Sequence, residues 1–426
     1  MGIKNLLSLM NSIVDSRLNN TKVSELQLKR KLSIESDISY NTTVKPVSLN
    51  NYNDDEFNEK LEPEFDEYIT NLSKDNTDKL SESSELSYNS DENYKISTNM
   101  KFKNLEYKKI AIDASLLIYQ YVIGIRNTSS DLTSLGGDFT SHIHAVVSKS
   151  LLYLDNNITP IFVFDGKPPE MKSDVLIKRR TERLNAKKQY EDEIDESEKI
   201  KLFKKSTIVT YKQMEQCKEI LRAMGIPVVE SLEEADSQLA YLTKEHNVYG
   251  AGSEDMDLLA FGATKLLKNI SSSKKNNIIE YDLINIQINL QLNTIEFIHL
   301  CILLGCDYVE VISGITPKIA YEIIVKHRSI FSFLNSDDSK RYIIPYNYKK
   351  QCHAAINYFV KCPHNKVTEK DLKLGVYNVD KIKSLLICKY SYSRTKVEKI
   401  ISKLRNETTK SPTFHRSEMF EKYPIT

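Results

Sequence analysis

The chain has 426 residues, of which 40% are apolar and 27% are charged, and its formal net charge is +1. This length allows one large domain or two ordinary ones, and the composition is that of a soluble globular protein with a sizeable core. No apolar run approaches the length needed to cross a bilayer and the N-terminus lacks the pattern of a signal peptide, so we expect no membrane segment. The six cysteines form no CxxC pair, which is typical of reduced thiols in an intracellular protein.

Charge is distributed unevenly along the chain. Residues 1–100 carry 11 Lys and Arg against 18 Asp and Glu, whereas the remainder carries 48 against 40. The remainder is basic even though it contains the clustered carboxylates described below. Its surface is therefore expected to suit a polyanion.

The first hundred residues divide into a short helix and a long polar segment. Residues 3–14 have helical spacing, and we expect this helix to dock on the distant core. Its apolar face consists of Ile3, Leu6, Leu7 and Met10. Residues 19–100 are rich in Asn, Ser, Asp, Glu and Tyr, cannot bury enough apolar surface to offset their ordering entropy, and are predicted to be mostly disordered. A spacer is favoured over a regulatory segment.

Short apolar strands and helical segments alternate in the middle of the chain. Three apolar runs end in carboxylates: Lys109 to Asp113, Pro160 to Asp165 and Asn247 to Asp257. A segment with apolar residues at helical spacing follows the first run, and another such segment precedes the second run. A helix from Thr210 to Met224 leads to a strand at 228–230 and then to a helix opening at Leu232. Such alternation predicts a mostly parallel sheet with helices on both faces.

Two further helical regions flank the sheet. The segment from Met171 to Lys205 is almost entirely charged, and we expect a helix without a core stripe. From Thr294 the pattern is helical throughout, interrupted by the turn at 313–317. Thr316 as N-cap and Pro317 at the first helical position predict a helix start. Together with Lys318 and Lys326, this helix N-terminus is suited to bind a phosphate backbone without base-specific contacts.

Seven carboxylates fall at predicted strand ends and helix starts. If the three runs are neighbouring parallel strands, the acidic groups gather where open α/β sheets hold ligands. Each one alone is more simply interpreted as a surface charge or a helix cap, but seven such placements are not a coincidence. Oxygen ligands without His or Cys favour Mg²⁺ or Mn²⁺, and two ions suit phosphodiester hydrolysis. The set is Asp113, Asp165, Glu234, Asp236, Asp255, Asp257 and Asp307.

Another metal set is conceivable among the cysteines and histidines. Its members are Cys352, His353, Cys362 and His364. Their spacing matches no common zinc finger, and buried thiols with surface histidines are the simpler interpretation.

Several long blocks resemble the flap endonuclease (XPG-like) family of structure-specific 5′ nucleases. They are MGIKNL, IAIDASLLIYQYVIGIR, VFDGKPPEMKSDVLIKRRTER, EEADSQLAYL, SEDMDLLAFG and LCILLGCDYVEVISGITPKIAYEIIVKH. They occur in the order of the family, and a weaker likeness extends to about residue 404. The resemblance implies a PIN-like, mostly parallel sheet followed by a helix-two-turn-helix (H2TH) DNA-binding region.

The resemblance also implies a division of the chain. The parts are an N-terminal piece of the nuclease domain (1–18), an acidic insertion (19–100), an XPG N-type nuclease region (101–166), a helical arch (167–210), an XPG I-type nuclease region (211–293), an H2TH region (294–335), a C-terminal helical region (336–404) and a tail (405–426).

Site roles are implied position by position. The seven carboxylates would be metal ligands, directly or through water, and Asp255 is also expected to be essential for turnover. Lys172 and Arg179 would contact the scissile phosphate from the base of the arch. Tyr119 would stack on a base, its alternative being an ordinary core aromatic. DNA contacts are expected at Gly2, Tyr119, Gly314, Thr316, Lys318 and Lys326.

Some residues depart from the family pattern. Asp236 stands where the family usually has Glu, so its contact with a metal is expected to run through water. The Gly-x-Gly turn reads Gly314-Ile315-Thr316, which loses backbone freedom and puts a monovalent cation site there in question. The end of the chain shows no sliding-clamp motif.

The implied function is a 5′ flap endonuclease with 5′–3′ exonuclease activity, acting in DNA replication and repair on flap, nicked or gapped duplexes. It would use two Mg²⁺ ions, with Mn²⁺ as substitute. We expect a monomer in the nucleus or at a viral replication site in the cytoplasm. The alternatives are a Holliday-junction resolvase or repair exonuclease of the same family, and a non-catalytic protein that binds DNA junctions.

Overall fold

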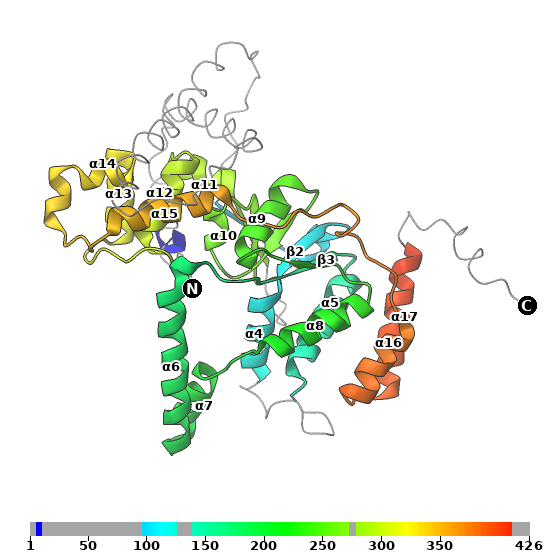
Figure 1. Cartoon of the computed structure of the whole chain (residues 1–426). Helices are drawn as coiled ribbons and strands as arrows, with labels where there is room; N and C mark the ends of the chain where they lie inside the picture. The colour runs from blue at the N-terminus through cyan, green and yellow to red at the C-terminus, as the bar shows by residue number, and fades with distance from the viewer. Residues whose placement is uncertain (1–5, 11–95, 126–138, 272–277, 411–426) are drawn as a thin grey trace, which may run out of the picture.

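The computed structural model of the chain describes residues 6–10, 96–125, 139–271 and 278–410 (Figure 1). Within these residues a seven-stranded sheet runs in the order β1-β7-β6-β5-β2-β3-β4. The strands are β1 (Ser97–Met100), β2 (Lys109–Asp113), β3 (Thr159–Phe164), β4 (Val228–Glu230), β5 (Gly250–Gly252), β6 (Lys265–Lys268) and β7 (Ile278–Asp282).

The sheet is mostly parallel, as predicted. Strands β6, β5, β2, β3 and β4 pair in parallel, whereas β7 is antiparallel to both of its neighbours. The three carboxylate-ending runs are confirmed as adjacent strands. The strand in the third run is shorter than the predicted run from Asn247 to Asp257, since only Gly250–Gly252 is a strand.

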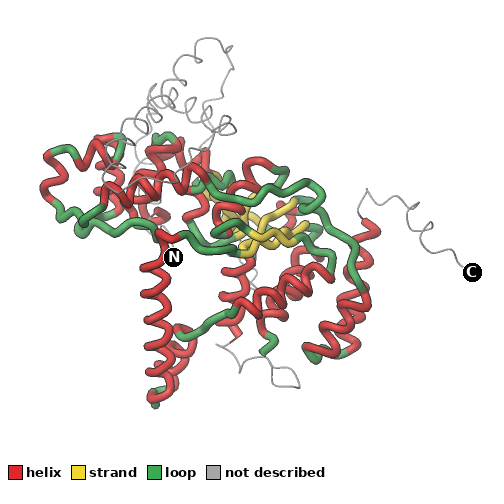
Figure 2. Tube along the Cα trace, in the orientation of Figure 1, coloured by secondary structure: helices red, strands yellow, loops and turns green. Residues whose placement is uncertain are grey.

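Helices cover both faces of the sheet, and Figure 2 shows the strands at the centre between them. Along β2 and β3 alternate residues enter two separate cores: Ala111 and Ile161 enter one, Ile112 and Phe162 the other. The first face carries α9 (Ala235–Glu245), α10 (Asp257–Ala260), α11 (Leu283–Leu290) and α12 (Thr294–Leu304), and the second carries α4 (Ala114–Ile125), α5 (Ser141–Asp155) and α8 (Tyr211–Ala223).

The charged segment forms a helical hairpin that extends away from the sheet (Figure 1). The structure corrects the prediction of one helix, because α6 (Ser173–Asp192) ends before α7 (Glu196–Lys205) begins. Asp195 caps α7 by accepting from the Glu198 amide at 2.8 Å, which explains the break. The two helices pack on each other through Tyr190 and Phe203, whose ring centroids are 5.3 Å apart. Only Ala186 is buried in α6, so the predicted lack of a core stripe is confirmed for that helix.

The chain then forms a helical lobe beside the sheet. After α12, α13 (Pro317–His327) starts at the predicted cap, where Thr316 Oγ1 accepts from the Ile319 amide at 3.4 Å. The lobe continues with α14 (Ile330–Leu334) and α15 (Tyr348–Lys361). The chain ends with α16 (Val379–Lys383), a π-helical turn at Ser384–Lys389 and α17 (Arg394–Lys410), which pack against α8 and α5. The last helix thus runs six residues past the predicted boundary at 404.

The N-terminal region differs from expectation at its end. Residues 97–100, expected to belong to the disordered insertion, form β1 and pair with β7. The sequence Ser-Thr-Asn-Met lacks the alternation of apolar and polar residues by which a half-buried strand is recognised. Such alternation is not needed here, because β1 is an edge strand with three exposed residues. Residues 11–95 lie outside the described part, so the disorder predicted for 19–95 remains a prediction.

The docking predicted for the first helix is confirmed over its described residues, 6–10, which are helical. Leu6, Leu9 and Met10 are at most 2% exposed and belong to the same core as α9 and α12. Ile3 lies outside the described residues.

In the described part of the chain no single helix has the length and apolar composition to cross a membrane. Taken together α11 and α12 do, but they are bent by 84° relative to each other.

Candidate active site

Four acidic residues lie where three neighbouring parallel strands end. Asp113 is the last residue of β2, Asp165 follows β3 directly, and Asp255 and Asp257 follow β5 after a short turn. Because β5, β2 and β3 are adjacent and parallel, these carboxylates share one edge of the sheet, where α/β folds hold ligands.

Helix α9 brings two more carboxylates to this edge. Glu234 is its N-cap residue and Asp236 lies in its first turn. The helix starts at Ala235 and not at Leu232 as predicted. The Ala235 amide donates to Asp165 Oδ1 at 2.8 Å, so the carboxylate that follows β3 takes the role of the cap. The Glu234 side chain makes no capping hydrogen bond, although the residue occupies the N-cap position.

The carboxylates repel one another strongly. Burial raises the pKa of Asp113 to about 7, and Asp165 and Asp255 add to the shift. Burial also raises the pKa of Asp236 well above its usual value, followed by repulsion from Asp255, Asp113, Glu234 and Asp257. Because these groups resist ionising together, the site is suited to a cation.

Hydrogen bonds orient several of these groups. Asp113 accepts from the Leu116 amide at 2.9 Å and from Ser253 Oγ at 3.1 Å. The Asp257 amide donates to Asp255 Oδ1 at 3.1 Å. Sequence reasoning missed Ser253, although it lies two residues before Asp255.

Gly166 permits the close approach of two carboxylate-bearing segments. Its amide donates to the Glu233 carbonyl at 2.6 Å. A Cβ at this position would lie only 2.3 Å from the Ser231 carbonyl oxygen and 2.6 Å from that of Leu232. Glycine is therefore required for the segment after Asp165 to lie against the loop that leads to Glu234.

The base of the hairpin contributes two basic groups. Lys172 Nζ donates to Glu234 Oε1 and lies 3.1 Å from Asp307 Oδ2. Arg179 Nη2 donates to both oxygens of Asp307, at 2.8 and 3.0 Å. Burial by itself would raise the pKa of Asp307, but Lys172 and Arg179 outweigh it and hold the pKa below its usual value. The structure thus brings the two predicted basic residues onto the predicted carboxylates.

The donor set fits hard divalent cations. All seven groups offer oxygen ligands only, which Mg²⁺ and Mn²⁺ prefer. Among the described residues no three acidic, histidine or cysteine side chains form a ready-made cage around one ion. Magnesium nevertheless keeps several waters and needs only one or two direct carboxylates, so a site without such a cage is compatible with it.

Sequence and structure comparisons identify the family. The model of the XPG N-terminal domain matches residues 92–186, and that of the XPG I-region matches residues 225–307. The chain is similar to flap endonuclease 1 of Nematostella vectensis, with 39% identity over 311 residues that cover 71% of this chain and 81% of that protein. The chain belongs to the flap endonuclease (XPG-like) family.

Two further similarities show how far the likeness extends. Flap endonuclease 1 of Theileria parva is 36% identical over 323 residues, which cover 74% of this chain but only 63% of that protein. The solved structure of flap endonuclease-1 from Methanococcus jannaschii superimposes with a TM-score of 0.56 and 29% identity, covering 74% of this chain and 97% of that one.

The remaining predicted site residues that the structure of this flap endonuclease family member describes lie on α4 and in the helical lobe. Tyr119, on α4, is half-buried and faces α6, with Arg183 Cζ 6.0 Å from its ring centroid. Its role in stacking on a base stays a prediction beside the alternative of an ordinary core aromatic. Gly314 has a φ of +88°, which suits glycine. Gly2 lies outside the described residues.

The two predicted phosphate-binding lysines differ in their surroundings. The side chain of Lys318 is 84% exposed and lies 3.9 Å from Glu322. Lys326 forms an ion pair with Asp338, to which His327 is also bonded. Lys318 is therefore the more available of the two.

The cysteines and histidines considered as a second metal set have other contacts. The ring of His353 stacks on Phe331 with centroids 4.0 Å apart, and that of His364 stacks on Tyr241 at 3.7 Å. Cys362 is buried, and its thiol donates to the Ser237 carbonyl at 3.2 Å. Cys352 and Cys362 are buried thiols, as the simpler interpretation predicts, but the two histidines are half-buried and not at the surface.

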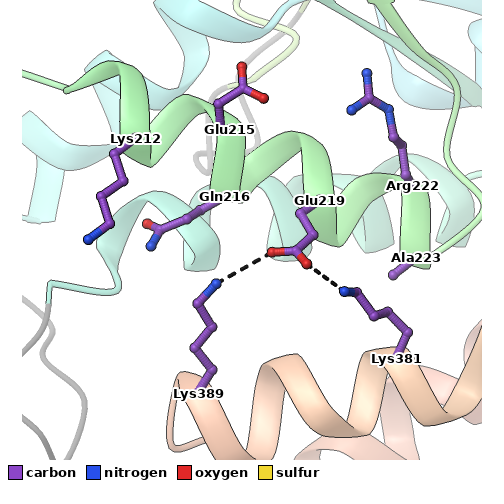
Figure 3. Close-up of a pocket in the computed structure, with 8 residues that line it drawn as sticks. All are labelled: Lys212, Glu215, Gln216, Glu219, Arg222, Ala223, Lys381 and Lys389. Atoms are coloured by element: carbon purple, nitrogen blue, oxygen red, sulfur yellow. Dashed lines mark hydrogen bonds and ion pairs between the residues drawn. The ribbon is translucent and has the colours of Figure 1, made fainter.

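A hollow of about 630 Å³ lies apart from the carboxylates, between α8 and the α16 segment (Figure 3). At its centre Glu219 bonds to Lys381 Nζ at 2.6 Å and to Lys389 Nζ at 3.4 Å. These ion pairs join α8 to the C-terminal helical segment. The hollow is lined by Lys212, Glu215, Gln216, Glu219, Arg222, Ala223, Lys381 and Lys389.

Proposed function

We propose that this protein is a structure-specific 5′ nuclease that hydrolyses DNA phosphodiesters where a single-stranded 5′ flap joins a duplex, and that it also has 5′–3′ exonuclease activity. The observation that carries the proposal is a cluster of carboxylates at the ends of three parallel strands and at the start of α9, in which Glu234 and the nearby Asp307 are bonded to Lys172 and Arg179 at the base of a helical hairpin. Family membership supports the same reaction.

We propose Mg²⁺ as the cofactor, two ions in each site, with Mn²⁺ as substitute. Asp113, Asp165, Asp255 and Asp257 at the strand ends, with Glu234, Asp236 and Asp307, would hold them, directly or through water. When bound, such ions supply an activated water and neutralise charge on the reacting phosphodiester.

The chain's own basic groups would position the substrate. Lys172 and Arg179, now held on Glu234 and Asp307, are placed to exchange these carboxylates for the scissile phosphate and to stabilise its developing charge. The N-terminus of α13 with Lys318 would hold the duplex backbone without reading sequence. Tyr119, beside α6, would stack on a base next to the cleavage point.

We further propose that the protein acts as a monomer inside the cell, on branched DNA during replication or repair. All six cysteines lie in the described part of the chain and are free thiols. This supports a reducing compartment, either the nucleus or a viral replication site in the cytoplasm.

A panel of labelled substrates tests the proposal. Purified protein is incubated with 5′-flap, single-stranded, nicked, recessed-end and four-way-junction DNA, with and without Mg²⁺. Mg²⁺-dependent cleavage that prefers the flap is expected. Preference for the four-way junction or the recessed end would instead indicate a resolvase or a repair exonuclease.

Replacing one carboxylate separates catalysis from binding. Asp255→Asn is expected to abolish turnover while flap binding survives. Asp380→Asn, which removes an exposed carboxylate on α16, serves as control and should cleave like wild type. A wild-type protein that binds junctions but cuts none of the substrates would establish the non-catalytic alternative and reject the nuclease.

A further inference from the structure

Tyr308, which no sequence argument singled out, contacts the carboxylate set directly. It follows Asp307 in the chain, is 5% exposed, and its hydroxyl donates to Glu234 Oε2. The other oxygen of Glu234, Oε1, accepts from Lys172. The two partners thus hold Glu234 from both ends of its carboxylate.

The ring of Tyr308 is held by an aromatic cluster. Phe261, Tyr358 and Phe359 all pack against it edge-on, with centroid distances of 6.5, 5.1 and 5.4 Å. A ring packed on several sides cannot swing without disturbing its neighbours. The cluster therefore fixes where the hydroxyl lies, and Glu234 is held against a rigid part of the core.

Tyr308 also lies close to the ammonium of Lys172. Lys172 Nζ is 5.7 Å from the centroid of the Tyr308 ring, within the range of cation–π attraction. The same tyrosine thus contacts one predicted metal ligand and one predicted phosphate-contacting residue.

We propose that Tyr308 is a positioning residue that fixes the orientation of Glu234 and Lys172, and that it thereby sets the affinity of the site for a divalent cation. A carboxylate oriented by an outer hydrogen bond binds its ion better than one that rotates freely, and loss of such a bond costs about 10-fold to 100-fold in metal affinity. The inference rests on the proposed function.

The test compares two substitutions that each remove one hydroxyl from the same aromatic cluster. Tyr308→Phe keeps the ring and removes only the bond to Glu234. Tyr358→Phe, the matched control, changes the packing cluster without removing that bond. Binding of Mn²⁺ in the absence of DNA is measured by electron paramagnetic resonance from the fraction of free ion, so the main readout does not depend on turnover.

Tyr308→Phe is expected to bind Mn²⁺ at least 10-fold more weakly than wild type, and Tyr358→Phe to bind it within 2-fold of wild type. In single-turnover cleavage the Mg²⁺ concentration for half-maximal rate should rise for Tyr308→Phe, and excess Mg²⁺ should restore most of the rate. Flap binding in Ca²⁺ should be unchanged.

Three results would overturn the inference. Unchanged Mn²⁺ affinity in Tyr308→Phe would do so, and so would an equal loss in both variants, since packing would then be the cause. A Tyr308→Phe protein that melts below the assay temperature would show that the hydroxyl is required for the stability of the fold. If wild type neither binds Mn²⁺ nor cleaves, the proposed function itself fails, which is a separate outcome.

Discussion

Gly166→Ala is expected to damage the site while leaving the rest of the fold in place. The added methyl carbon would stand 2.3 Å from the carbonyl oxygen of Ser231 and 2.6 Å from that of Leu232. Both contacts are with backbone, which cannot rotate away as a side chain can. The segment after Asp165 and the loop before Glu234 must therefore separate.

The magnitude follows from that displacement. A normal carbon to oxygen contact is about 3.5 Å, so the two segments must move apart by roughly 1 Å. Overpacking of this kind costs about 1–3 kcal/mol of stability. A displacement of about 1 Å between reacting groups costs about 10²-fold in rate. Loss of activity should therefore exceed what the loss of stability would cause.

Urea denaturation and single-turnover cleavage of a 5′ flap measure the two effects separately. Gly124→Ala is the control, because nothing lies within 4 Å of a Cβ at that position near the end of α4. It should be neutral or stabilise by up to about 1 kcal/mol. A Gly166→Ala protein with wild-type stability and rate would refute the argument from close approach.

Three other predictions concern the arch, the insertion and acid stability. Lys172→Ala and Arg179→Ala should each reduce the single-turnover rate by about 10²-fold to 10³-fold with little change in flap affinity; a fall in affinity at unchanged rate would assign them to binding. Deletion of residues 20–95 should leave flap cleavage largely intact, and a folded but inactive deletion would contradict the spacer interpretation. Burial, with a contribution from His353, lowers the pKa of His299 to about 3, so as pH falls below about 6.5 the imidazole is protonated in the unfolded chain before it is protonated in the folded one. The free energy of unfolding should therefore be lower by roughly 2 kcal/mol at pH 5 than well above pH 6.5. His299→Gln should lose that part of the pH dependence in urea denaturation.

The alternating part of the fold could be predicted because its sequence pattern is strong. The apolar runs at β2 and β3 are buried on both faces, and such strands are visible as continuous apolar stretches. Strand β1 was missed because an exposed edge strand needs no apolar residues. The break between α6 and α7 was missed because charge alone does not reveal where a helix ends, although Asp195 is a recognisable N-cap.

The site was predicted only as far as residue type and position along strands allow. The carboxylates of β2, β3 and β5 could be assigned because parallel strands end at a common edge. The bonds of Lys172 and Arg179 to Glu234 and Asp307 could not, because they depend on how the hairpin stands on the sheet. Gly166 and Tyr308 were missed because each acts through a neighbour distant in sequence, Ser231 and Glu234 respectively.

The burial of Leu6, Leu9 and Met10 makes the folded body a discontinuous domain. These three side chains belong to a core whose other members come from Ile96 and later residues. A protein trimmed to begin at Ile96 would keep every strand of the sheet yet lose three filled positions, and each vacated leucine or methionine site costs about 2–5 kcal/mol. The smallest independently stable unit is therefore expected to include the first ten residues, either linked to the body or supplied as a separate peptide.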